Sequence, residues 1–188
     1  KSHDAEVAIA YLNQALNYPE NLGEGKLNDA KDNQIHYYLG EAYRMLGSDN
    51  KSREQYQLAS TGLTEPAGMM FYNDLPPETI FYQGLALLRL EQLEAAFIRF
   101  NKLIDYGEKH LFDKVQIDYF AVSLPDLMVF EDDLQIRNRV HCLFIAGLGW
   151  LGKNEWQKAQ ALFDEVSHLE SYHFGIRFHF IPNDGDIH

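Results

Sequence analysis

The chain has 188 residues, of which 46% are hydrophobic and 23% are charged, a composition typical of a folded globular chain and too apolar for disorder. Its 16 Lys and Arg stand against 28 Asp and Glu, which gives a formal charge of −12 with neutral histidines. Because such an acidic surface repels phosphate groups, the charge argues against nucleic acid and anionic membrane surfaces as partners.

No apolar run approaches the roughly 20 residues that span a bilayer, so we expect no membrane-spanning segment. The first residues lack the pattern of a signal peptide and enter a helical pattern at once. The single cysteine, Cys142, excludes an internal disulfide bond and favours a reducing compartment, so we expect the cytoplasm.

Apolar residues recur at helical spacing along most of the chain, and the expected fold class is all-α. In chain order the pattern predicts helices over residues 5–18, 32–46, 50–58, 79–90, 93–106, about 133–151 and 155–169, and a short segment at 172–180. Gly47 is expected to end the second helix, and Asp132 or Asp133 to cap the sixth. A brief alternation at 116–122 is too isolated to predict a sheet.

Three pairs of predicted helices share one internal pattern. In each pair a glycine in the first helix precedes an aromatic residue in the second at the same offset, namely Gly40 and Tyr56, Gly84 and Phe100, and Gly147 and Phe163. Glycine at such a position lets the two helices of a hairpin approach closely. The pattern resembles the tetratricopeptide (TPR) repeat, whose period is about 34 residues.

The TPR resemblance implies an α-α superhelix of helical hairpins, with repeats at 33–64, 77–108 and 140–171 within a single domain over 1–188. Residues 1–18 match the second helix of a further repeat whose first helix is missing, so we expect this chain to be a segment of a longer protein. Residues 172–188 are expected to form a C-terminal cap and tail.

Several motifs indicate a narrower resemblance. They are Tyr18-Pro19-Glu20-Asn21-Leu22-Gly23, Tyr38-Leu39-Gly40, Tyr106-Gly107-Glu108-Lys109-His110 and the segment 118–126. Together they are similar to the C-terminal TPR region of a family of large bacterial proteins, whose N-terminal domain is uncharacterised and thought to resemble sugar-processing β-sandwich proteins. This resemblance implies a carbohydrate context and transfers no catalytic residue to this segment.

Two insertions separate the predicted repeats. Gly40 and Gly84 are 44 residues apart and Gly84 and Gly147 are 63 apart, and the excess lies at 61–77 and 110–132. Both insertions are apolar and contain the candidate contact residues Phe71, Tyr72, Tyr119 and Phe120. They either fold back over the helix ends or contact another domain or a ligand.

The TPR resemblance also implies a concave groove lined by the first helix of each repeat, with the candidate partner-binding residues Tyr37, Glu41, Arg44, Phe81 and Arg89. A clamp for a peptide carboxylate is not expected, because only Arg89, with Arg44 beside it, matches the basic set that such a clamp requires. The aromatic residues of this lining are also compatible with a place in the core.

Chemical motifs are absent from the sequence. No His-x-x-x-His or Cys-x-x-Cys spacing occurs, and His168, His173 and His179 are spaced too irregularly to share a helix face, so we expect no metal site. The run Glu131-Asp132-Asp133 suits a helix cap better than acid–base catalysis. We therefore expect no cofactor and no enzyme activity.

The function that the sequence favours is a protein-interaction or scaffold module that docks a neighbouring domain or another chain. The alternative is an accessory region of a carbohydrate-active enzyme, which would contribute loops to the site of an upstream domain. The two differ in whether the aromatic residues of the insertions are exposed to a sugar or covered by a protein.

Overall fold

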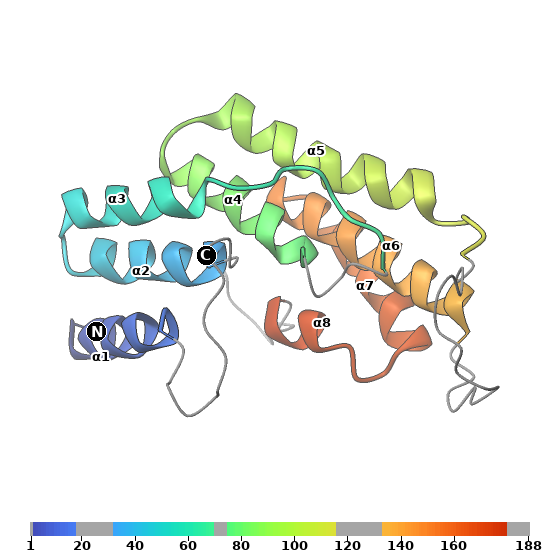
Figure 1. Ribbon diagram of the computed structural model, residues 1–188, viewed down its shortest axis with the longest axis horizontal. Coiled ribbons are helices and arrows are strands. Elements are labelled where there is room, and N and C mark those ends of the chain that lie inside the picture. The colour runs from blue at the N-terminus through green and yellow to red at the C-terminus, as the bar shows by residue number, and fades with distance from the viewer. Residues whose placement is uncertain (1, 18–31, 70–74, 116–132, 180–188) are drawn as a thin grey trace, which may run out of the picture.

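The computed structural model describes residues 2–17, 32–69, 75–115 and 133–179, and this part of the chain contains helices and no strand (Figure 1). The all-α class is thereby confirmed for these residues, and the alternating segment 116–122 lies outside them. The described helices are α1 (Ser2–Ala15), α2 (Asn33–Met45), α3 (Asp49–Ala59), α4 (Pro77–Arg89), α5 (Leu93–His110), α6 (Leu134–Gly152), α7 (Trp156–Leu169) and α8 (Phe174–His179).

Helix ends follow the sequence where a local signal marks them. Asp133 caps α6, because its Oδ1 accepts hydrogen bonds from the backbone N–H groups of Gln135 at 2.9 Å and Ile136 at 3.3 Å. Helix α5 runs one turn beyond its predicted end at Tyr106. Gly107 does not end it, because this residue packs against α6, where an added Cβ would lie 2.4 Å from the Cys142 carbonyl oxygen.

The helices α2 and α3, α4 and α5, and α6 and α7 are each joined by a three-residue turn of the same geometry. The middle residue of each turn has a positive φ, 68° at Gly47, 63° at Glu91 and 62° at Asn154. The following N–H donates back to the carbonyl five residues earlier, which is the Schellman motif. These bonds are Ser48 to Tyr43, Gln92 to Leu87 and Glu155 to Trp150, each 2.9 Å long.

A glycine lies against an aromatic ring inside each of these three hairpins. An added Cβ would lie 2.5 Å from the Tyr56 ring at Gly40, 2.3 Å from the Phe100 ring at Gly84 and 2.3 Å from the Phe163 ring at Gly147. Each glycine precedes its ring by 16 residues. The close approach that the sequence predicted for these pairs is therefore present in all three hairpins.

The hairpins α4–α5 and α6–α7 share the main core, and α3 packs against α4 in a second, smaller cluster. The Phe100 ring of α5, fully buried, also faces Gly152 of α6, where a Cβ would come within 2.2 Å of it. Phe100 therefore lies between glycines of two different helices, and α5 packs along α6 as closely as the helices within a hairpin do. At the two ends, α1 packs against α2, and α8 brings Gly175 against the Phe144 ring of α6.

The segment 61–69 crosses α4 and α5 towards α6 (Figure 1). Polar side chains of four helices bind its backbone or side chains. Asn33 Nδ2 donates to the carbonyls of Ala59 and Thr61, and Gln83 Nε2 to those of Thr61 and Leu63. Lys102 pairs with Glu65, and His141 Nε2 lies 2.8 Å from the Ala67 oxygen. These side chains replace the hydrogen bonds that an irregular segment lacks.

Candidate functional site

Three of the predicted groove residues meet at one carboxylate between α2 and α4. The Nε and Nη2 of Arg89 donate to Glu41 at 2.6 and 3.2 Å, and Arg44 Nη2 donates to it at 2.8 Å. The hydroxyl of Tyr56 donates to Glu41 Oε1 at 2.6 Å. Both guanidinium groups remain about half exposed, with 51% of the Arg44 side chain and 44% of the Arg89 side chain accessible, whereas the Glu41 side chain is only 20% accessible.

This cluster fixes the charge state of its members. Burial alone would raise the pKa of Glu41, but the hydrogen bonds from Tyr56, Arg44 and Arg89 outweigh it and hold the pKa below its ordinary value. Burial, with the nearby charge of Glu41, raises the pKa of Tyr37 to about 12. At neutral pH the cluster therefore holds one carboxylate, two guanidinium groups and protonated phenols, which is a rigid polar surface without a titrating acid or base.

Four tyrosines join the cluster to the core. The Tyr37 ring lies 6.0 Å from that of Tyr56 and 5.4 Å from that of Tyr82, measured between ring centroids. The hydroxyls of Tyr38 and Tyr82 are 2.9 Å apart and hydrogen-bonded. These contacts connect α2 to α4 and orient the face on which Arg44 and Arg89 are exposed.

The remaining predicted contact residues do not join this surface. Phe81 is buried and packs against Phe100 and Tyr82, so it belongs to the core, which was the alternative interpretation of the groove aromatics. The insertion residues lie outside the described part of the chain; they are Phe71, Tyr72, Tyr119 and Phe120.

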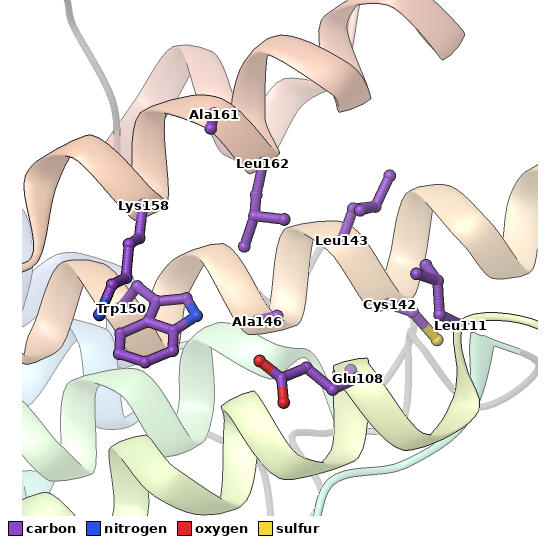
Figure 2. Close-up of a pocket in the computed structure, with 10 residues that line it drawn as sticks. Glu108, Leu111, Cys142, Leu143, Ala146, Trp150, Lys158, Ala161 and Leu162 are labelled. Carbon is purple, nitrogen blue, oxygen red and sulfur yellow. The ribbon is translucent and has the colours of Figure 1, made fainter.

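A second feature, an apolar hollow of about 350 Å³ between α5, α6 and α7, escaped the sequence analysis (Figure 2). The short side chains of Ala146 and Ala161 line it, and Gly107 lets α5 pack closely against α6 at its edge. Trp150 closes one end, and Lys158 Nζ lies 4.1 Å from its ring centroid. In Figure 2 the carboxylate of Glu108 extends from α5 towards this space.

Burial perturbs Cys142, which lines this hollow, and the neighbouring His141. Burial raises the pKa of the Cys142 thiol to about 12, and its Sγ donates to Asn138 Oδ1, so it is not a nucleophile at neutral pH. Burial also lowers the pKa of His141, whose Nε2 is engaged by Ala67. Within the described ranges no three His, Cys, Asp or Glu side chains gather as a metal ion would require. Every helix described is too short or too polar to cross a membrane.

Comparison with known proteins adds no assignment. No protein-family model matches the chain, and no solved structure matches it. What this protein does must therefore be inferred from the arrangement of its own helices and exposed side chains.

Proposed function

We propose that this chain is a TPR-like helical array that serves as a protein-interaction or scaffold module, docking a neighbouring domain or another chain. The observation that supports this proposal most strongly is the repetition of one hairpin design. The three hairpins share the 16-residue distance from glycine to ring and the same Schellman turn with a positive φ at Gly47, Glu91 and Asn154.

Stacked hairpins suit binding because each one packs only against its neighbours. The array then buries a continuous core while leaving long helix faces open to a partner. In this chain the face formed by α2 and α4 carries Arg44 and Arg89, and Met45 beside them is 56% exposed. Arginine and tyrosine are enriched among the residues that dominate binding energy at protein interfaces.

The Glu41 carboxylate prepares this face for binding. By holding both arginines, it reduces the side-chain entropy that a partner would otherwise have to offset on association. Each guanidinium still has donors directed away from Glu41, because arginine carries five N–H groups and these contacts use three of them in total. We infer that the face presents two oriented cations beside apolar methionine and tyrosine surface.

Site-specific photo-crosslinking tests the proposal. A photoreactive phenylalanine analogue is placed at Met45 on the α2–α4 face and, as the matched control, at the exposed Glu54 of α3. In extract of the source organism we expect one protein or domain to crosslink at Met45 and not at Glu54, and the product to disappear in the Arg44→Ala/Arg89→Ala double variant. If no crosslink depends on the position and on these arginines, the α2–α4 face is not a docking surface.

A further inference from the structure

The apolar hollow between α5, α6 and α7 continues into a second one. The second hollow, of about 250 Å³, lies around Phe112, Ile136 and Leu169, and Leu111 lines both. Phe112 is 82% exposed and Ile136 is 43% exposed. Along α6 the groove extends from Ile136 to Trp150, which is about 21 Å at 1.5 Å per residue. An elongated apolar occupant fits this shape better than a compact one.

Both basic side chains along the groove form an ion pair, whereas the Asp113 carboxylate lies against a histidine that pairs with it ionically only when protonated. Asp113 contacts His110, Arg139 contacts Glu165, and Lys158 contacts Glu155 while lying over the Trp150 ring. Glu108 forms no ion pair with another described residue, and it lines the groove near its middle. A positive charge on the occupant would therefore find one carboxylate opposite it, within a chain whose net charge is −12.

The chemistry of the walls favours a helix over an extended peptide. An extended peptide would bring unpaired backbone N–H and C=O groups against apolar side chains, where they would lack partners. Apart from residues 111–113, the described walls are helices that bond their own backbone groups, and they provide no strand edge to pair with. A helix satisfies its backbone internally and presents side chains at i, i+3, i+4 and i+7 to such a groove.

We propose that this groove docks an amphipathic helix of about 14 residues that carries an apolar stripe and one lysine or arginine facing Glu108. A second copy of this chain is a poorer occupant, because two chains that each carry a charge of −12 repel one another. The inference rests on the proposed interaction role but uses a surface separate from the α2–α4 face.

The test uses the full chain with Trp156→Phe, which leaves Trp150 in the groove as the only tryptophan. Three synthetic 14-residue peptides are titrated: one with a leucine stripe and a central lysine, one with glutamate in place of that lysine, and one with scrambled order. Tryptophan emission and peptide anisotropy report binding. We expect the lysine peptide to shift the Trp150 emission and to bind about three- to tenfold more tightly than the glutamate peptide.

Three variants locate the binding. Glu108→Lys should reverse the preference between the lysine and glutamate peptides, whereas Glu54→Lys on α3 changes the net charge equally and should not. Ala161→Phe fills the hollow from an exposed position on α7 and should weaken binding at least tenfold without unfolding the chain, as circular dichroism verifies.

Equal binding of the scrambled peptide, no shift of Trp150 emission, or indifference to both groove variants would overturn the proposal. Self-association in sedimentation that Ala161→Phe abolishes would also overturn it, in favour of a second copy. Crosslinking at Met45 does not involve this groove, so the two proposals can fail separately.

Discussion

The contact between Gly84 and the Phe100 ring decides whether Gly84→Ala stabilises or destabilises the chain. On an exposed helix, Gly→Ala stabilises by about 1 kcal/mol, because alanine has the higher helix propensity. Here the new Cβ would lie 2.3 Å from Cε1 and 2.6 Å from Cζ of the Phe100 ring, whereas carbon atoms in contact prefer about 3.5–4.0 Å. The ring cannot move aside, since Gly152 confines it from α6.

Overpacking a filled core costs about 1–3 kcal/mol, and an approach of 2.3 Å to a confined ring places this site in the upper part of that range, about 2–3 kcal/mol, which exceeds the gain in helix propensity. We therefore expect Gly84→Ala to destabilise the chain by about 1–2 kcal/mol net, which lowers the melting temperature by about 3–6 °C for a chain of this length. Equilibrium unfolding in urea, followed by circular dichroism at 222 nm, measures the free energy directly.

The Phe100→Leu background provides the control. Removing the ring should make room for the Cβ, so that the same Gly84→Ala change becomes neutral or stabilises by up to about 1 kcal/mol. A sign change between the two backgrounds establishes that ring contact causes the loss. If Gly84→Ala stabilises the wild-type chain, the close packing of α4 against Phe100 is wrong.

Three further predictions follow from single sites. Glu91 occupies a φ of 63°, which glycine adopts without strain, so Glu91→Gly should stabilise the chain by about 0.5–1 kcal/mol in urea unfolding, and an equal loss would contradict the turn geometry. Burial lowers the pKa of His141 in the folded state below its ordinary value of 6.5. As the pH falls towards and below 6.5, the unfolded state therefore binds more protons than the folded state. Stability should then fall as the pH drops from 7.5 to 5.5, and His141→Gln should reduce that slope in thermal melts; an unchanged slope would exclude His141 as its source. Cys142 is buried with a raised pKa and should react with a thiol reagent at pH 8 only after unfolding, so rapid labelling of the folded chain would contradict its burial.

Local features of the structure were predictable because neighbouring residues determine them. The helix period, the cap at Asp133 and the stop at Gly47 depend on a few adjacent side chains. The repeated glycine and ring could also be found, since a fixed offset is visible in one sequence. The end of α5 was harder to predict, because a glycine such as Gly107 commonly marks the end of a helix. Here Gly107 instead packs against α6, a helix that begins more than 20 residues later.

Long-range features could not be predicted in this way. Asn33, Gln83 and His141 hold the segment 61–69 from three different helices, and none of them differs locally from an exposed polar residue. The groove depends on Ala146 and Ala161 being small at the point where three helices meet, and on Gly107 for the close contact of α5 with α6. Only the packing of α5, α6 and α7 reveals that the short side chains at these positions leave one continuous space.

The measurement that tests the repeated hairpin most directly is a nuclear Overhauser spectrum of the labelled chain. We expect cross-peaks from the Hα protons of Gly40, Gly84 and Gly147 to the rings of Tyr56, Phe100 and Phe163, with these Hα signals displaced by ring currents. All three pairs should be present together, because the same contact recurs in each hairpin. Absence of these cross-peaks in a folded sample would contradict the common design of the three hairpins, and with it the TPR-like array that we propose.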